Sequence, residues 1–295
     1  MRENIDFFSN GTRCSAWLYM PSVDEKHPVI VMAHGLGGVR EMRLDAYAER
    51  FVAAGYACFL FDYRNFGASD GGRRQRINVK EQLVDWNSAI DFIKKDERID
   101  AAKILLFGSS FSGGHVITLS SKRKDIVATI SQCPYTNTLA TMRTASLLSA
   151  FKVIPTIIVD LCSCVIGYHP VMLKLADACG KAAIMAVSDY KGYLELVPEV
   201  SNFINKAPAR TFIEFFKYSP SKYTKKIESP IYYAVCLKDT LAPAKETIKW
   251  AKLSNNATIE EYDCGHFDIY LGDYFEKAVV DYIVFLDNIL IRERL

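Results

Sequence analysis

Short hydrophobic runs and amphipathic segments alternate along most of this 295-residue chain. The hydrophobic runs are rich in β-branched and aromatic residues, which predicts buried strands. We expect these strands at residues 28–34, 57–63, 103–108, 126–133, 231–237 and 257–263. Between them, segments such as VKEQLVDWNSAIDFIKK and YFEKAVVDYIVFLDNIL carry apolar residues at helical spacing. Continuous apolar strands that alternate with helices predict an α/β fold, with a mostly parallel sheet and helices on both of its faces.

The beginning of the chain and a long central segment depart from this alternation. IDFF and CSAWLYM flank Asn10-Gly11, a pair that favours a two-residue turn, so the chain is expected to start with a β-hairpin. Between residues 135 and 228 the alternation lapses, and the sequence is helical and rich in Leu, Ile and Met. Ligands bind beyond the carboxyl ends of the strands in an open α/β sheet, so an insertion here would cover the site. We predict a core domain of residues 1–134 and 229–295, with residues 135–228 as a cap.

Composition narrows the choice of partners. The 36 basic and 34 acidic residues nearly cancel, and no basic block stands out, which argues against nucleic acid as a partner. A small neutral or apolar molecule is the expected ligand. The N-terminal sequence MRENIDFFSNGTR becomes polar before a long apolar run develops, so no signal peptide is expected and the predicted location is cytoplasmic.

The cysteines and the most apolar stretch have simple interpretations. We expect the eight cysteines to be reduced, small, buried apolar residues, because a chain this long does not need disulfides. Cys162 and Cys164 lack the spacing and the second ligand pair of a structural zinc site, so no metal is expected. Residues 147–168 are interrupted by Lys152 and other breaks, which leaves them short of the roughly 20 apolar residues of a membrane span. We interpret this stretch as a lid helix or an acyl-binding wall.

The strongest local signal is LLFGSSFSGGH at residues 105–115, where an expected strand runs into a glycine-flanked serine and then into a helix. A nucleophile elbow needs small neighbours because the backbone at its serine is strained, and its general pattern is Gly-x-Ser-x-Gly. Gly108, Ser110 and Ser112 fill these places, so a serine replaces the second glycine. Ser109 and Ser112 are alternative nucleophiles, but only Ser110 has a glycine two residues before it and a small residue two after it.

Two other interpretations of this segment stay open. It could be a tight strand-to-helix turn with incidental serines, or a phosphate-binding loop. A Walker loop requires Gly-Lys-Ser/Thr, which this segment lacks, and the Gly-x-Gly-x-x-Gly spacing does not occur in it either.

Two later residues offer the partners that a serine nucleophile requires. Asp239 lies two residues past the strand expected at 231–237, and His266 lies in the loop DCGHF after the last expected strand. A serine hydroxyl at its ordinary pKa is a poor nucleophile, so an imidazole must accept its proton and a carboxylate must orient the imidazole. The order serine, acid, histidine is that of the α/β hydrolases. We predict Ser110 as nucleophile, His266 as base and Asp239 as the orienting acid.

Other histidines and acidic residues are weaker candidates. His34, Asp62 and Ser110 follow the order of the chymotrypsin class, but that order belongs to a β-barrel fold. His115 lies five residues beyond Ser110 on the expected helix and therefore points away from it, which predicts a core histidine. The acidic alternatives to Asp239 either flank His266 closely in sequence or lie in the cap; they are Asp263, Asp268 and Asp160.

The loop HGLGG follows the first expected parallel strand. At this position the chemistry requires backbone N–H groups that stabilise an oxyanion. We assign that role to the N–H groups of Leu36 and Phe111, and we expect His34 to shape the loop.

Several motifs together resemble a known family. HGLGGVREMRLDAYAERF, FDYRNFGASDG, GSSFSGGH and AAIMAVSDYKGYLELV are similar to those of bacterial and fungal α/β hydrolases that include polyketide-transferase-like and acetylxylan-esterase-like enzymes. The resemblance covers nearly the whole chain and implies the α/β-hydrolase fold, acyl chemistry without a cofactor, and catalytic roles for Ser110, Asp239 and His266. Asn65 stands where many relatives have glycine; asparagine tolerates left-handed backbone, so the turn is expected to form. The neighbouring charged residues Asp62, Arg64 and Asp70 are expected to be structural.

The expected activity is cleavage of a carboxylic ester or thioester through an acyl-enzyme on Ser110. The apolar cap suggests a lipophilic acyl substrate. An acyltransferase would use the same three residues and differ in the second nucleophile. A peptidase of the prolyl-oligopeptidase type usually carries a propeller domain, for which this chain has no length. A ligand-binding protein that kept the fold without catalysis is the alternative from another class.

Overall fold

The computed structural model of the protein describes residues 1–21, 25–142 and 147–292. Its main sheet has eight strands in the order β1-β2-β4-β3-β5-β6-β10-β11. Strand β2 pairs antiparallel with β1 and with β4, and the strands from β4 to β11 in this order run parallel. The strands are β1 (Arg2–Ser9), β2 (Thr12–Tyr19), β3 (His27–Ala33), β4 (Ala57–Phe61), β5 (Ile99–Ser109), β6 (Ile126–Gln132), β10 (Ile231–Cys236) and β11 (Ala257–Tyr262).

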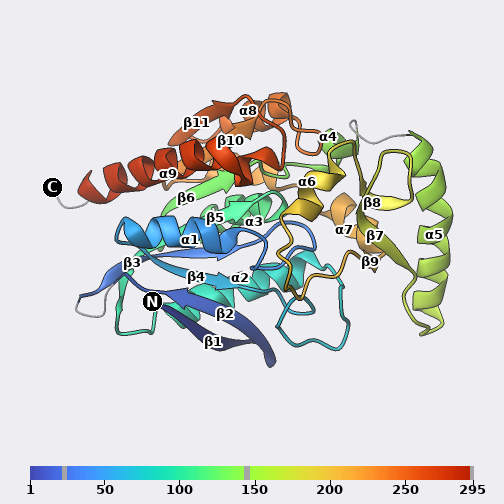
Figure 1. Ribbon diagram of the computed structural model, residues 1–295, viewed down its shortest axis with the longest axis horizontal. Coiled ribbons are helices and arrows are strands. Elements are labelled where there is room, and N and C mark those ends of the chain that lie inside the picture. Colours follow the sequence, from blue (N-terminus) through green and yellow to red (C-terminus); the bar gives the residue numbers. More distant parts are fainter. Residues whose placement is uncertain (22–24, 143–146, 293–295) are drawn as a thin grey trace.

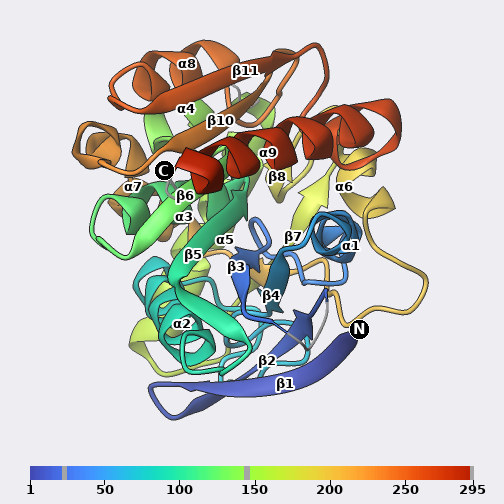
Figure 2. The same ribbon diagram turned by 90° about the vertical axis from the view of Figure 1, so that its left-hand side faces the viewer.

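Helices cover both faces of this sheet, as Figure 2 shows. Helices α1 and α9 pack on one face, and α2, α3 and α8 pack on the other. The bounds of these helices are α1 (Leu44–Ala53), α2 (Val79–Ile93), α3 (Phe111–Ser120), α8 (Ala244–Ala251) and α9 (Gly272–Arg292). The predicted α/β fold is therefore confirmed, including the parallel sheet between two helical layers.

Local sequence explains the strands and the first turn. Residues 104–107 of β5 are apolar and fully buried because helices cover the strand on both sides. The predicted hairpin is present, with φ angles of 46° at Asn10 and 79° at Gly11. Such positive φ angles are what a two-residue hairpin turn requires.

The segment between β6 and β10 forms a separate group of elements at one end of the sheet (Figure 1). It contains a second sheet in the order β8-β7-β9. Its elements are α4 (Thr138–Met142), α5 (Leu147–Val165), β7 (Met172–Asp177), β8 (Ala183–Ala186), α6 (Tyr190–Glu195), β9 (Ala207–Pro208), α7 (Thr211–Lys217) and the 3₁₀ helix η1 (Pro220–Lys226). We propose that residues 135–228 act as a cap over the site.

Two expectations about this segment and the cysteines need correction. The segment was expected to be helical, but it also holds three strands; in β7 the buried Leu173 and Leu175 alternate with the exposed Lys174, a period of two residues that indicates a strand. The cysteines are all free among the described residues, and five of them are buried. The exceptions are exposed and lie in the cap segment rather than in core strands; they are Cys162, Cys164 and Cys179.

Candidate active site

Ser110 lies in a strained turn between β5 and α3. Its backbone angles, φ 57° and ψ −118°, are outside the regions that ordinary residues favour. Close neighbours explain the glycines around Ser110. A Cβ on Gly108, two residues before it, would lie 2.4 Å from the Ser112 carbonyl oxygen. A Cβ on Gly35, in the loop after β3, would lie 2.9 Å from the Ser110 Cβ. The strand, the turn and the helix thus have the arrangement predicted for a nucleophile elbow.

Sheet register brings the site loops together. Ala33 at the end of β3 pairs with Gly108 of β5, and Gly108 pairs with Ser131 of β6. The parallel strands therefore end at the same edge, and the residues that follow them converge there. Ser110 follows β5, while Asp239 and His266 follow β10 and β11.

The three predicted residues form one hydrogen-bonded line. His266 Nε2 lies 2.9 Å from Ser110 Oγ, and His266 Nδ1 lies 2.6 Å from Asp239 Oδ2. The other carboxylate oxygen of Asp239 accepts backbone N–H bonds of 2.7 and 2.6 Å from Leu241 and Ala242. The side chains of His266 and Asp239 are each only 1% exposed, so water does not compete for these contacts.

The two neighbouring serines are engaged elsewhere. Ser109 Oγ accepts a bond of 2.9 Å from the Gln132 amide and also contacts the Tyr270 hydroxyl. Ser112 Oγ lies 2.9 Å from the Tyr63 hydroxyl, which explains how a polar residue fits the fully buried position of the second glycine. Neither hydroxyl is paired with His266 in the described contacts, whereas that of Ser110 is.

The alternative histidines occupy structural positions. His115 is fully buried, with Nδ1 2.7 Å from the Tyr218 hydroxyl and Nε2 3.0 Å from Gln82 Oε1. Burial lowers the pKa of His115 to about 3, so its ring is neutral. His34 Nδ1 lies 2.9 Å from the Gly35 carbonyl oxygen within the HGLGG loop, and burial lowers the pKa of His34 to about 4. Both rings make hydrogen bonds with neighbouring groups and take no part in the contacts that join Ser110, His266 and Asp239.

The alternative acids also have other partners. Asp263 pairs with Lys238 at 3.0 Å, and Asp268 accepts the Gly265 N–H at 2.8 Å. Asp160 pairs with Arg210 inside the cap segment. Among the residues that the structure describes, Asp239 is therefore the one whose carboxylate hydrogen-bonds to the His266 ring.

The loop after β4 is held by its own polar contacts. Asn65 has a φ of 72°, so the expected left-handed turn forms without glycine. Asp62 accepts the Arg40 N–H at 2.8 Å, and Arg64 binds the Asp85 carboxylate. Asp70 lies 2.6 Å from Arg13. These side chains have the structural roles expected of them.

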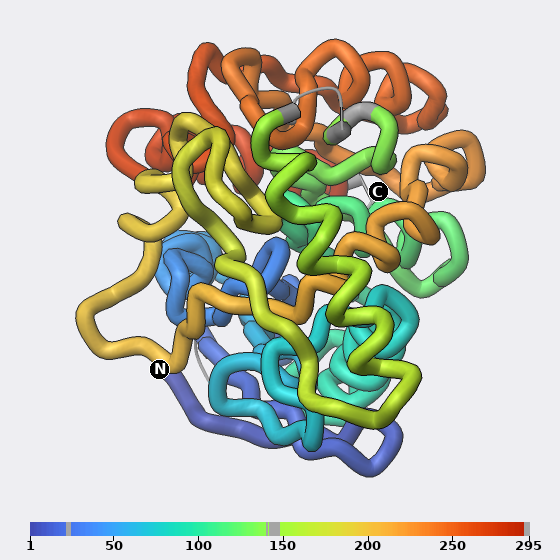
Figure 3. Tube along the Cα trace, turned by 90° about the vertical axis from the view of Figure 1, so that its right-hand side faces the viewer, coloured from blue at the N-terminus to red at the C-terminus, as the bar shows by residue number. Residues whose placement is uncertain are grey.

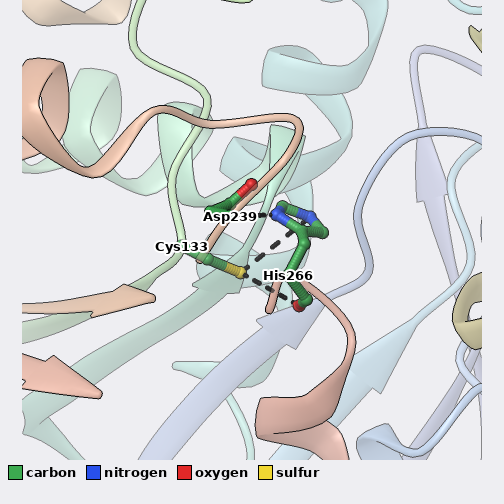
Figure 4. A group of neighbouring side chains, drawn as sticks. All are labelled: Cys133, Asp239 and His266. Atoms are coloured by element: carbon green, nitrogen blue, oxygen red, sulfur yellow. Dashed lines mark hydrogen bonds and ion pairs between the residues drawn. The ribbon is translucent and has the colours of Figure 1, made fainter. Parts of the chain in front are cut away.

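Cys133 is a site residue that the sequence did not reveal. It follows β6, has a φ of 34°, and places its sulfur 4.0 Å from His266 Nε2 (Figure 4). The same sulfur lies 3.6 Å from Ser109 Oγ. The ligand atoms of Cys133, Asp239 and His266 lie within 4.8 Å of one another. Among the described residues, these three form the group that could hold a metal ion. His266 Nδ1 already faces Asp239, and Nε2 faces Ser110, so hydrogen bonding accounts for both ring nitrogens. The only available signal was the position of Cys133 at the carboxyl end of a parallel strand.

The charges of this group shift its pKa values in opposite directions. Burial opposes the charged form of His266, but Asp239 and Cys133 together outweigh burial, and the pKa of His266 is raised well above its ordinary value. Burial also opposes ionisation of Cys133. Hydrogen bonding with Cys236 and the His266 charge outweigh that effect and lower the pKa of Cys133 to about 6. A thiolate at Cys133 and an imidazolium at His266 therefore stabilise each other.

A cavity of about 320 Å³ opens above Ser110 and His266. Its walls come from the core loops and from the cap segment, where α5, β8 and α7 contribute mostly aliphatic and aromatic side chains. Leu36 and Phe111, the expected oxyanion donors, both line it next to Ser110. No aspartate, glutamate, lysine or arginine is among the described lining residues. The cavity thus suits an uncharged, apolar group whose reacting end meets Ser110.

The parallel sheet, the strained serine turn and the group of elements above the strand ends define an α/β hydrolase. A family model described as serine aminopeptidase, S33, matches residues 24–265, and the chain belongs to this family.

Relatives and solved structures agree with this assignment. The chain is 42% identical over 288 residues to the quorum-quenching protein AidA of Acinetobacter baumannii, covering 97% of this chain and 95% of the relative. It is 25% identical to the thiohydrolase aneE of Aspergillus aculeatus, covering 98% and 93%. It is 23% identical to the polyketide transferase af380 of Aspergillus fumigatus, covering 97% of both chains. The structure of a DcsB complex with a substrate analogue superposes with a TM-score of 0.83 at 22% identity, covering 98% and 99%. The expected resemblance to the polyketide-transferase-like branch is confirmed.

Proposed function

We propose that the protein is a serine hydrolase that cleaves a carboxylic ester or thioester through an acyl-enzyme intermediate. The observation that carries the proposal is the line of contacts from Ser110 Oγ to His266 Nε2 at 2.9 Å and from His266 Nδ1 to Asp239 at 2.6 Å. His266 accepts the serine proton while Ser110 attacks the acyl carbonyl, and Asp239 stabilises the resulting imidazolium. The proton then passes to the leaving group as its bond to the acyl carbon breaks.

Backbone N–H groups complete the proposed site. Phe111 is the first residue of α3, where N–H groups lack a partner within the helix, and Leu36 lies in the loop after β3. We assign both N–H groups to the oxyanion that forms on the carbonyl carbon. In the second half-reaction His266 takes a proton from water, the resulting hydroxide attacks the acyl-enzyme, and Ser110 is released with its proton restored.

The cavity supports a lipophilic acyl group as the substrate. Its volume of about 320 Å³ is roughly ten times the ~30 Å³ that a water molecule occupies in the liquid, which leaves room for a medium-length chain. The relative named thiohydrolase is compatible with a thioester as substrate. An aminopeptidase would have to bind the charged amino end of a peptide, and the described lining offers no carboxylate for it. Location in the cytoplasm stays a prediction.

Acyl transfer is the second candidate, because several relatives are named polyketide transferases. The first half-reaction would be the same. An alcohol, thiol or amine would then replace water in the attack on the acyl-enzyme. Chromatography of products formed with and without added alcohol separates the two outcomes, since transfer yields a new ester and hydrolysis yields only the acid.

A series of p-nitrophenyl esters tests the acyl preference. Each buried methylene contributes about 0.8 kcal/mol, so six further methylenes favour the octanoate over the acetate by at least ~100-fold in kcat/KM. Steady-state kinetics on esters of increasing length should show a rise followed by a plateau or fall when the cavity is full. Equal kcat/KM for acetate and octanoate would contradict the proposed acyl pocket.

Ala150→Phe provides a structural control for that preference. Ala150 lines the cavity from α5, so the larger side chain should lower kcat/KM for the octanoate by at least ~10-fold and leave the acetate nearly unchanged. Ile158 lies on the same helix, is 56% exposed and is not among the lining residues. Ile158→Phe should therefore leave both esters unaffected. A similar loss of kcat/KM for the octanoate in both variants would show that the effect comes from disturbing the helix and not from filling the cavity.

The Cys133–His266 contact predicts a change in pH dependence. His266 must be neutral to act as a base, so kcat/KM falls as pH drops below its pKa, which lies above the ordinary value. A negative charge at Cys133 raises that pKa, and Cys133→Ala removes the charge. The acid limb of the pH profile should therefore move to lower pH. Cys133→Ser should give the same shift because a serine hydroxyl does not ionise in this range, and an unmoved limb in both variants would refute the coupling.

A further inference from the structure

Helix α5 has the reverse of the polarity expected at a protein surface. Three of its polar residues, Ser149, Asp160 and Ser163, are only 5%, 0% and 9% exposed, whereas the apolar Phe151 and Val165 are 74% and 87% exposed. A helix between a protein core and water normally buries its apolar stripe and presents polar residues outward. Water is therefore an unfavourable medium for the outer face of α5.

The apolar outer face is long and uncovered. Figures 1 and 3 show α5 along the outer edge of the cap, with no other described element in front of it. Within the described residues, Leu148–Val165 is the one helical stretch long and apolar enough to cross a membrane by length and composition, and only 22% of it is buried. Its 19 residues extend about 28 Å. The exposed large side chains in and after it are Leu148, Phe151, Ile154, Ile158, Val159, Val165, Ile166 and Tyr168.

The inner face of α5 is fixed to the cap. Asp160 binds the Arg210 guanidinium at 2.9 and 2.6 Å and also accepts the backbone N–H groups of Val171 and Arg210. Val153 is buried in a cluster with Leu173 and Ala209. Crossing a membrane would expose Asp160 and break this cluster. The geometry fits a helix that lies along a lipid surface with its outer face inserted.

Charge around α5 favours an anionic partner. The helix has two charged residues, and because Asp160 is buried, Lys152 is the one that is exposed. Lys152 Nζ contacts the Gly180 carbonyl oxygen at 2.8 Å, in the turn that also carries the exposed Lys181. Residues 135–228 contain eleven lysines and arginines against seven aspartates and glutamates, while the whole chain is nearly balanced. Basic residues beside an inserted apolar helix are attracted to anionic lipid headgroups.

The same helix forms a wall of the candidate active-site cavity. Ser149, Ala150, Val153 and Ile157 line the cavity, and Ile154 both lines it and is 51% exposed. The outer apolar face and the apolar cavity are thus the two sides of one helix. Lipophilic molecules concentrate in membranes, so docking through this face would bring the cavity close to them.

We propose that α5 docks the protein on an anionic lipid surface, with the helix in the plane of the headgroups and its face of Phe151, Ile158 and Val165 inserted. The proposal does not depend on the proposed catalysis, because binding can be measured without substrate. A second copy of the chain is the other possible occupant. Twofold pairing of α5 would place two copies of Lys152 and Lys181 at one interface, whereas an anionic surface neutralises these charges.

Cosedimentation with vesicles tests this surface. The full chain is mixed with vesicles of phosphatidylcholine alone or with an equal part of phosphatidylglycerol, and the bound fraction is measured. We expect binding to the anionic vesicles, and Phe151→Ser/Ile158→Ser should weaken it by at least ~10-fold because both side chains lose their inserted area. Neither residue lines the cavity, so hydrolysis of a short soluble ester should stay unchanged.

A matched control replaces exposed apolar side chains elsewhere. Phe8 on β1 and Val284 on α9 are 70% and 53% exposed, and Phe8→Ser/Val284→Ser should bind vesicles like the wild type. The proposal fails if the wild type does not bind anionic vesicles, or if both double variants lose binding equally. It also fails if gel filtration shows a dimer that Phe151→Ser/Ile158→Ser dissociates while no vesicle binding occurs, since a second copy would then occupy the face.

Discussion

Ser110→Ala is expected to lower kcat for p-nitrophenyl ester hydrolysis by roughly 10⁶-fold, the effect of removing the nucleophile in other serine hydrolases. Ser110 Oγ is the hydroxyl that faces His266 Nε2, and alanine leaves the base with nothing to deprotonate. Because serine and alanine differ by one oxygen, the fold should persist, which circular dichroism and thermal unfolding can check. Activity should be measured with enough protein to detect the residual rate.

Ser112→Ala is the matched control for that variant. Ser112 is fully buried and its hydroxyl contacts Tyr63 instead of His266. Its removal should cost some stability, since Tyr63 loses a partner, but should reduce kcat by less than about tenfold. Full activity in Ser110→Ala, or loss of activity only in Ser112→Ala, would show that a residue other than Ser110 is the nucleophile.

Asp239→Asn is the second large effect, an expected decrease in kcat of about 10⁴-fold with the fold intact. The Asp239 carboxylate accepts the proton of His266 Nδ1 and leaves Nε2 free to accept the serine proton. An amide can donate to Nδ1 instead, which places the imidazole proton on Nε2 and removes the base. The amide also lacks the charge that raises the His266 pKa, so the remaining activity should have its acid limb at lower pH.

Asp268→Asn separates a specific role from a general loss of charge near His266. Asp268 is two residues from His266 but binds the Gly265 N–H, and its carboxylate is outside the Ser110–His266–Asp239 line. This variant should keep kcat within about tenfold of the wild type. Near wild-type turnover in Asp239→Asn together with a severe loss in Asp268→Asn would transfer the orienting role to Asp268.

Sequence alone predicted the strands of the core sheet and the three residues at their ends. The strands were readable because their runs are buried on both faces, as residues 104–107 show. Ser110 was identifiable because a strained turn restricts its neighbours to small residues. Asp239 and His266 required the chain order of the fold as well, since nothing in the sequence next to Asp239 distinguishes it from Asp263 or Asp268.

Features that depend on three-dimensional proximity were not predictable. Cys133 follows β6 and His266 follows β11, and the two residues meet because both strands pair in parallel with β10. A lone cysteine carries no local pattern. The strands of the cap segment are short, and their pairing joins Met172 with Pro208, far apart in sequence. The exposed apolar face of α5 could not be recognised, because the periodicity of a sequence shows that a helix has two faces but not which of them meets the core.

Mapping of a covalent adduct tests the central role of Ser110 most directly. The wild-type protein is incubated with a fluorophosphonate probe and digested with trypsin, and the peptides of residues 104–122 and 125–143 are sequenced by tandem mass spectrometry. The account predicts one adduct per chain, located on Ser110, with inactivation proportional to its formation, and no adduct in Ser110→Ala. An adduct on Ser109, Ser112 or Cys133, or an active enzyme that the probe does not label, would contradict it.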